Sequence, residues 1–281
     1  MAISAADVKK LRDKTGAGMM DCKNALIEAD GDFSKAERIL KELGKAAAAK
    51  RSGRATNEGR IFVATEGDKA VMLELACETD FVARNETFVA LGDDLVKDVL
   101  KRGLTSVDET LENTVKDAIS TIKENMSLRR FSVLEKGSSE IFSTYVHGDS
   151  GRMGGVVVVS AADSSALARP EVTEFAFDCA LHVVAFRPAY LNEDAVEPAY
   201  LQEQQEIFMQ QALNLGKPEK VLQGIVQGKV RKHLSEICLL EQGFVKDEKK
   251  PVKTAAAEVS KAVGTDVTVT SFLVYAVGEE I

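Results

Sequence analysis

Histidine and cysteine are scarce in this chain of 281 residues, and neither occurs at the spacing of a metal site. The histidines are His147, His182 and His233, and the cysteines are Cys22, Cys77, Cys179 and Cys238. These residues lie far apart along the chain, and no two cysteines form a C-x-x-C pair. We therefore expect reduced, buried thiols, no metal ion and no cofactor, which argues against a metalloenzyme.

An excess of positive charge and a long apolar run are also missing. Acidic residues outnumber basic ones by 44 to 36, which gives a formal net charge of -8 and an isoelectric point near 5.2. Nucleic-acid binding requires clustered Lys and Arg, so we expect no direct nucleic-acid partner. No run approaches the roughly 18 apolar residues of a membrane-spanning helix, and no charged-then-apolar leader begins the chain. These absences predict a cytoplasmic protein without a membrane partner.

Motifs of covalent catalysis are absent as well. The chain has no G-x-S-x-G elbow, no G-x-x-x-x-G-K-[ST] loop and no Cys/His nucleophile pattern. A hydrolase or transferase would have to use scattered carboxylates such as Glu74, Glu78 and Asp80. We therefore expect a binding protein and not an enzyme.

The composition is that of an ordinary globular protein, with 45% hydrophobic and 28% charged residues. Before Gly44 the chain has three stretches of helical periodicity, and Ser4 with Asp7 forms a capping-box pair ahead of the first. Residues 45–54 are basic and alanine-rich, which is typical of a solvated linker; RNA or an acidic surface is the alternative. We predict a three-helix domain with a basic linker over residues 1–54.

The middle of the chain repeats one pattern, an extended hairpin with a Gly-Asp turn followed by a helix. The two copies span residues 60–101 and 140–186. A two-stranded unit cannot cover its own apolar face, so each copy needs another strand, for which residues 128–134 and 266–277 have the right pattern. The predicted boundaries are residues 55–139 for the core N-subdomain and residues 140–281 for the core C-subdomain.

A wholly helical pattern occupies about residues 193–237. It predicts two helices joined by a turn at Gly216-Lys217-Pro218, and Pro218 suits the first turn of a helix. If this hairpin projects from the core, its apolar positions favour a partner or a homodimer, and the core is another candidate dimer surface. The predicted fold class is α+β, with an N-terminal helical domain, a duplicated core of small antiparallel sheets and an inserted helical hairpin.

One aromatic residue, Phe81, stands between charged and polar neighbours in residues 79–85. This segment connects a strand pattern over residues 69–77 to a helix pattern that begins near Phe88. An apolar side chain on such a connection can enter another protein. The alternative is a hydrophobic staple, in which Phe81 folds back onto the start of its own helix.

Four short motifs occur in one order along the chain. They are TGAGMMDCK at residues 15–23, TDFV at residues 79–82, YVHG at residues 145–148 and HVVA at residues 182–185. In these motifs the chain resembles the elongation factor Ts family, and the resemblance extends over nearly the whole length. It implies an N-terminal ubiquitin-associated-like domain, a duplicated α+β core and a helical hairpin. It also implies guanine-nucleotide exchange on elongation factor Tu, which releases GDP so that GTP can bind.

The same resemblance assigns a partner-binding surface. It implies that Asp80 and Phe81 enter a cleft between two helices of the G domain of elongation factor Tu. The other residues that it implies for this partner are Thr79, Val82, His147, Arg12, Met19, Met20 and Lys23. From the residues alone, His147 could equally be a satisfied turn histidine, and one of the two methionines could pack in the core. Some family members continue into a C-terminal helical module, whose contacts we expect this chain to lack.

A protein of another class shares several of these features. A three-helix ubiquitin-associated-like domain also serves as a generic binding module, so a non-catalytic interaction adaptor is the alternative. Nucleotide release separates the two, because an adaptor would bind a GTPase without accelerating the loss of GDP.

Overall fold

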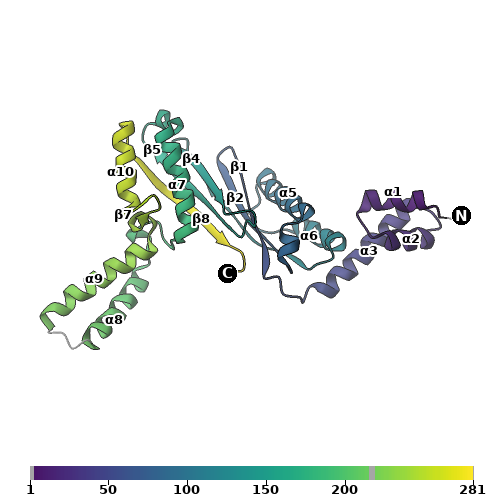
Figure 1. The fold of residues 1–281 in the computed structure, drawn as a ribbon, viewed down its shortest axis with the longest axis horizontal. Helices are drawn as coiled ribbons and strands as arrows, with labels where there is room; N and C mark the ends of the chain where they lie inside the picture. The colour runs from purple at the N-terminus through teal and green to yellow at the C-terminus, as the bar shows by residue number, and fades with distance from the viewer. Residues whose placement is uncertain (1–2, 215–218, 281) are drawn as a thin grey trace.

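The computed structural model of the chain describes residues 3–214 and 219–280, and Figure 1 shows an elongated molecule. An N-terminal helical unit lies at one end, and two small sheets with their helices fill the middle (Figure 1). At the other end project the hairpin helices α8 (Pro198–Asn214) and α9 (Glu219–Ile237). The turn expected at Gly216-Lys217-Pro218 lies outside the described residues. None of the described helices combines the length and apolar character needed to cross a membrane.

The N-terminal unit consists of the helices α1 (Ala5–Thr15), α2 (Met19–Glu28) and α3 (Phe33–Arg51). Ser4 and Asp7 form the predicted capping box, and Gly16 ends α1 in the left-handed conformation that glycine adopts most readily. The apolar faces of the three helices enclose a small core that includes Leu11, Leu26 and Leu40. A likeness to ubiquitin-associated domains stays a prediction, as do the domain boundaries.

The end of the third helix differs from the prediction. We expected α3 to stop before Gly44 and a linker to follow, but the helix continues to Arg51. Alanine is the strongest helix former, which favours the helix through residues 46–49. Gly44 lies inside the helix, at a point where α3 approaches α6 (Glu109–Ile122) closely. A Cβ at position 44 would be only 2.6 Å from the Cβ of Ser120. Glycine is thus required for close approach of the two helices and does not end the first.

The described strands form two three-stranded antiparallel sheets of the same plan and a two-stranded one. The first sheet has the order β1 (Glu58–Glu66), β2 (Lys69–Cys77), β3 (Met126–Glu135), and the second has the order β4 (Glu140–Val146), β5 (Met153–Ala161), β8 (Val267–Ala276). The additional strand expected in each copy is therefore confirmed. The register shifts after Glu74 in the first central strand and after Val158 in the second, which supports the inferred duplication.

The two sheets pack face to face, and helices cover their outer faces. Met72 and Val156, from the central strands, lie in a cluster between the sheets. The outer face of the first sheet packs on α5 (Glu86–Arg102) and α6, and that of the second packs on α7 (Pro170–Phe186) and α10 (Val252–Val263). Because the central strands are buried on both faces, their sequences are almost continuously apolar.

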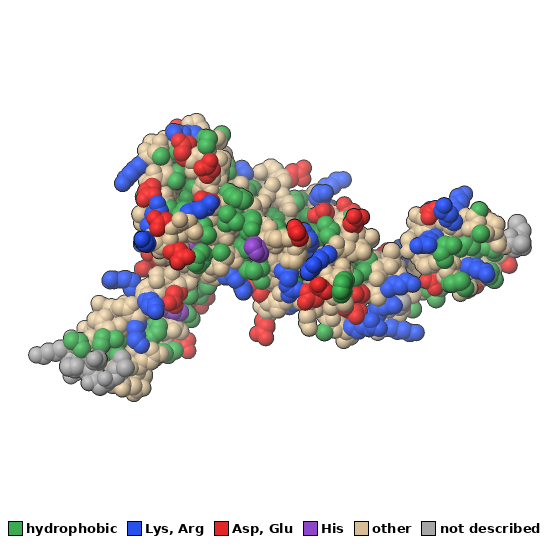
Figure 2. All heavy atoms as spheres, viewed as in Figure 1, with side chains coloured by type: hydrophobic (Ala, Val, Ile, Leu, Met, Phe, Trp, Pro, Cys, Tyr) green, Lys and Arg blue, Asp and Glu red, His purple; other side chains and the backbone are tan. Residues whose placement is uncertain are grey.

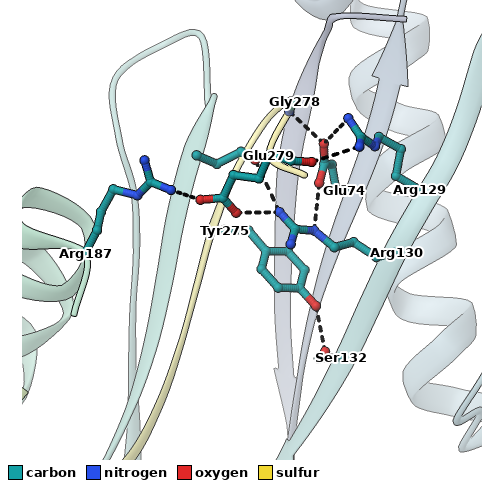
Figure 3. A network of polar contacts seen from close by, with 9 residues as sticks. Glu74, Arg129, Arg130, Ser132, Arg187, Tyr275, Gly278 and Glu279 are labelled. Carbon is teal, nitrogen blue, oxygen red and sulfur yellow. Dashed lines mark hydrogen bonds and ion pairs between the residues drawn. The ribbon is translucent and has the colours of Figure 1, made fainter. Parts of the chain in front are cut away.

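A network of charged and polar groups joins the sheets near the C-terminal end of β8 (Figure 3). Glu74, which is fully buried, accepts a hydrogen bond from Arg130 Nε at 2.8 Å and another from the Gly278 backbone N–H at 3.0 Å. Glu279 forms ion pairs with Arg130 and Arg187. The chain after β8 is therefore fixed to the first sheet.

The segments that follow the two central strands differ. In the first copy β2 leads into the one-turn helix α4 (Asp80–Ala83). In the second copy β5 leads into the 3-10 helix η1 (Ser164–Ala168), which Asp163 caps by accepting a hydrogen bond from the Ser165 N–H at 2.9 Å. Other elements for which we had no prediction are η3 (Leu239–Glu241), β6 (Gly243–Phe244), β7 (Asp247–Pro251) and α10, whereas η2 (Glu193–Ala195) lies at the start of the stretch predicted to be helical.

Candidate partner-binding surface

Phe81 lies on α4 and is 83% exposed, the highest value among the described large hydrophobic side chains. The next two residues behave differently, because Val82 is half-buried against the core of the first sheet and Ala83 is buried in it. The helical turn is thus anchored on one side and presents the Phe81 ring to solvent on the other. The alternative of a hydrophobic staple is wrong, since the ring does not fold back onto its own molecule.

Thr79 caps this turn, and all of its polar groups have partners. Its Oγ1 accepts a hydrogen bond from the Val82 N–H at 3.3 Å. The carboxylate of Glu124 accepts one hydrogen bond from the Thr79 N–H at 3.0 Å and another from the hydroxyl at 2.7 Å. The Thr79 carbonyl accepts from the Ala83 N–H and from the Cys77 thiol, each at 3.2 Å. The backbone that positions Phe81 is therefore fixed from both ends.

The thiol of Cys77 takes part in this turn as a donor and not as a nucleophile. Burial raises its pKa to about 12, and the nearby charge of Glu124 acts in the same direction. At neutral pH the group is therefore protonated, which suits its hydrogen bond to Thr79. A reactive cysteine would need the opposite shift, toward the thiolate.

A second carboxylate, Glu78, joins the turn to the segment after α3. It accepts a hydrogen bond from the Asn125 N–H at 2.6 Å and forms an ion pair with Arg54 at 3.3 Å. The backbone hydrogen bond from Asn125, followed by Arg54, holds the pKa of Glu78 below its usual value. Asn125 also donates its side-chain amide to the Arg54 carbonyl at 2.8 Å. Arg54, expected in a solvated linker, is thus attached to the core.

Asp80, the neighbour of Phe81, lies at the surface. Its carboxylate is 3.3 Å from the guanidinium of Arg84, one helical turn away, and both side chains are more than half exposed. Exposed pairs of this kind contribute at most about 1 kcal/mol, so a stronger partner can replace Arg84 at little cost. Asp80 is therefore available to another protein.

His147 directly follows β4, and its side chain is exposed at the surface. It also has hydrogen-bond partners within the chain. Its Nδ1 lies 2.9 Å from the hydroxyl of Tyr145, and its backbone N–H donates to Met153. The Tyr145 ring contacts Phe177 of α7 edge to face, with 6.1 Å between ring centroids. Phe177 is exposed, and sequence reasoning missed it because α7 is apolar on most of its circumference.

The N-terminal residues Arg12, Met19, Met20 and Lys23 are all exposed. Met19 is 42% and Met20 63% exposed, so neither methionine packs in the core as the alternative would have it. Ile27 is also exposed and follows Met20 and Lys23 at helical spacing on one face of α2, a signal that the sequence contained. Figure 2 shows hydrophobic and basic side chains side by side on this unit.

We call the exposed residues Arg12, Met19, Met20 and Lys23 the N-terminal surface, and residues 79–83 the Phe81 turn. The turn between α6 and β3, residues 123–125, contacts both the N-terminal unit and the Phe81 turn. Lys123 lies 3.5 Å from the carboxylate of Asp21 on α2, and a Cβ on Gly16 would be 3.0 Å from Thr121. The same turn supplies Glu124 to Thr79. In the part of the chain that the structure describes, no hydrogen bond or ion pair links His147 to either region, and no cluster of three His, Cys, Asp or Glu could hold a metal ion.

Comparison with known proteins agrees with the order of the sequence motifs. The family described as elongation factor TS matches residues 78–279, which is more than half of the chain. The elongation factor Ts of Treponema denticola is 46% identical over 279 residues and covers 99% of both chains. The elongation factor Ts of Borrelia recurrentis is 45% identical, and the match covers 99% of this chain and 100% of that protein. The elongation factor Ts of Treponema pallidum is also 45% identical, and the match covers 99% of each chain. The chain therefore belongs to the elongation factor Ts family, whose members are translation elongation factors.

Proposed function

We propose that this chain is a guanine-nucleotide exchange factor that binds elongation factor Tu in its GDP form and promotes the release of GDP during translation elongation. The observation that carries the proposal is Phe81, an apolar ring exposed on a turn whose backbone is fixed by hydrogen bonds. Membership in the elongation factor Ts family supports it. Such a factor performs no covalent step, so it needs neither a catalytic residue nor a cofactor.

Exchange follows from differential binding. A protein that binds the nucleotide-free form of a GTPase more tightly than the GDP form must, by thermodynamic reciprocity, weaken the binding of GDP. Phe81 suits this task because a ring can occupy a pocket that exists in one conformer and not in the other. Asp80 enters with it and offers a carboxylate to donors, or repels the environment of the nucleotide's metal ion.

The energies require more than one contact. Shifting a two-state equilibrium from 1:99 to 99:1 takes about 5.5 kcal/mol, whereas complete burial of one Phe side chain contributes about 1.5–3 kcal/mol. We therefore assign affinity to the N-terminal surface and to the core around His147, and discrimination between conformers to Phe81. The assigned contact residues are Arg12, Met19, Met20, Lys23, Thr79, Val82 and His147. Flexible methionines suit a surface that moves during exchange.

The test measures release of fluorescent GDP from purified elongation factor Tu with and without this chain. Phe81→Ala should lower the maximal release rate by about tenfold, since 1.4 kcal/mol corresponds to that factor, and should change the equilibrium affinity less. Leu43→Ala removes an exposed apolar side chain from α3, outside both the assigned contact residues and the hairpin, and is the matched control.

Three outcomes are informative. If the wild-type chain does not accelerate release, the exchange function is wrong. Binding without acceleration would instead indicate the interaction adaptor. If Phe81→Ala changes only the affinity, then the ring does not distinguish the conformers. A homodimer through the hairpin or core, a cytoplasmic location and the lack of a nucleic-acid partner stay predictions.

A further inference from the structure

The position of the Phe81 ring depends on the backbone of its turn, because the side chain is 83% exposed. Val82 and Ala83 anchor the C-terminal side of the turn by packing on the core of the first sheet. The N-terminal side is anchored at Thr79, and the anchor comes from a residue 45 positions later in the sequence. Both anchors are needed, since a four-residue helix has too few internal hydrogen bonds to be stable alone.

We propose that Glu124 is a positioning residue for nucleotide exchange: its carboxylate holds Thr79 so that the Phe81 ring is presented in one fixed orientation. This inference rests on the proposed function, because it concerns how Phe81 acts on elongation factor Tu. Glu124 need not touch the partner to have this effect.

The geometry suits a carboxylate in particular. One oxygen of Glu124 accepts from the Thr79 N–H at 3.0 Å and the other accepts from the hydroxyl at 2.7 Å. Since the hydroxyl donates its proton to Glu124, its lone pairs face the Val82 N–H, which is the capping contact of α4. Hydrogen bonds to a charged acceptor are stronger than neutral ones. One side chain therefore orients both the backbone and the cap of the turn.

The support for Glu124 is itself fixed on both sides. Lys123 ends α6 with a positive φ of 68°, and its N–H donates to the Ile119 carbonyl at 2.9 Å. Asn125 is buried and donates its N–H to Glu78 at 2.6 Å. Glu124 thus projects from a turn held by the end of α6 on one side and by Glu78, directly after β2, on the other.

A purely structural role for Glu124 makes a different prediction from a positioning role. Loss of structure would impair exchange whether or not Phe81 is present. Loss of positioning matters only while the ring is there to be positioned. A double-mutant cycle between Glu124 and Phe81 therefore separates the two.

The experiment measures maximal GDP release from elongation factor Tu and the half-saturating concentration of the factor. Glu124→Ala should slow maximal release by about tenfold, the factor that 1.4 kcal/mol represents, and should change the half-saturating concentration by less than about threefold. In the Phe81→Ala background it should have no further effect. Glu124→Gln keeps one acceptor oxygen and should recover part of the rate.

Glu112→Ala is the matched control, because Glu112 lies on α6, the helix that precedes the Glu124 turn, is exposed, and pairs with Lys116 one turn away. With this variant, elongation factor Tu should release GDP at the same rate as with the wild-type chain. If Glu124→Ala does not fold, as judged by circular dichroism, Glu124→Gln takes its place in the cycle.

Two results overturn the inference while leaving the exchange function intact. One is wild-type release by folded Glu124→Ala. The other is slowing by the same factor in the presence and absence of the Phe81 ring, which assigns Glu124 a role unrelated to positioning. If the wild-type chain itself fails to accelerate release, the proposed function fails first, and the two failures are distinct.

Discussion

Neighbouring side chains in the Phe81 turn have opposite environments, and this contrast defines the candidate site. Phe81 is exposed, whereas Ala83, two positions later, is fully packed. The contact from Glu124 that completes the turn could not be predicted from the sequence, since periodicity does not reveal hydrogen bonds between segments 45 residues apart. The exposure of Phe81 could be anticipated, because it is an aromatic residue among polar ones on a short connection; the partner contacts of Asp80 and Phe81 stay predictions.

His182 provides a prediction about pH at the level of one residue. Its ring is fully buried on α7, donates Nε2–H to the side-chain oxygen of Gln242 at 3.0 Å and stacks on Phe186. Burial lowers its pKa below the ordinary 6.5, so at mildly acidic pH the unfolded chain binds a proton that the folded chain does not. Stability should therefore fall as the pH decreases through 6.5, by at most about 1.4 kcal/mol between pH 7.5 and 5.5.

Urea unfolding at the two pH values checks this expectation. His182→Gln keeps a donor toward Gln242 and cannot titrate, so the difference in unfolding free energy between the two pH values should be smaller than in the wild type. His147→Gln, the same substitution at an exposed position, is the control. An identical pH dependence in wild type and His182→Gln would contradict the assignment.

At the level of the element, a glycine inside a helix permits close packing in one helix and lowers helix stability in another. Gly44 of α3 permits contact with α6, and the buried positions Leu40 and Ala48 continue the same stripe on either side of it. Sequence reasoning took this glycine as a helix end because glycine is common there. The spacing of the buried residues was the better guide, since it continues without interruption past Gly44.

Two glycine-to-alanine changes should have opposite signs. A Cβ on Gly92, inside α5, would overlap the ring of buried Phe62, whereas a Cβ on Gly224, inside α9, meets nothing within 4 Å. Gly92→Ala should destabilise the protein by about 1–3 kcal/mol through overpacking. Gly224→Ala should stabilise α9 by about 0.5–1 kcal/mol because alanine loses less backbone freedom in a helix.

Hydrogen exchange resolved along the chain measures both effects. Protection should decrease in α5 and β1 of the Gly92 variant and increase in α9 of the Gly224 variant. Increased protection in both would show that helix propensity outweighs packing at position 92, contrary to the close contact with Phe62.

At the level of the whole molecule, the two sheets form one unit. Met72 and Val156 pack between them, and the network around Glu74 joins the first sheet to the end of β8. Met72→Ala should lower the unfolding free energy by about 2–5 kcal/mol, as is usual for a fully buried methionine. Because the sheets share this layer, protection should be lost together in β2 and β5.

Met20→Ala makes the same chemical change at an exposed position of α2 and should shift stability by no more than about 0.5 kcal/mol. Hydrogen exchange combined with urea unfolding tests both variants. Separate transitions for the two sheets, with β5 unaffected by the change at Met72, would show that the halves fold independently.

Much of the architecture could be predicted, because the spacing of apolar residues and the positions of turn-forming residues are local properties of the sequence. The α+β class and the additional strands β3 and β8 were expected and are present, since each copy had an apolar face to cover. Contacts that depend on three-dimensional proximity could not be predicted. The exposed Phe177 beside Tyr145 and the attachment of Arg54 to Asn125 belong to this group.

The duplicated core has a geometric consequence. Its halves share strand order and bulge position, yet the chain after β2 carries an exposed aromatic ring, whereas the chain after β5 forms η1 with the sequence Ser-Ser-Ala-Leu-Ala. In the described residues the two halves thus differ at the corresponding positions that follow their central strands. The proposed contact of Phe81 can therefore be made once per chain, because the corresponding position in the second half of the core carries no exposed aromatic ring.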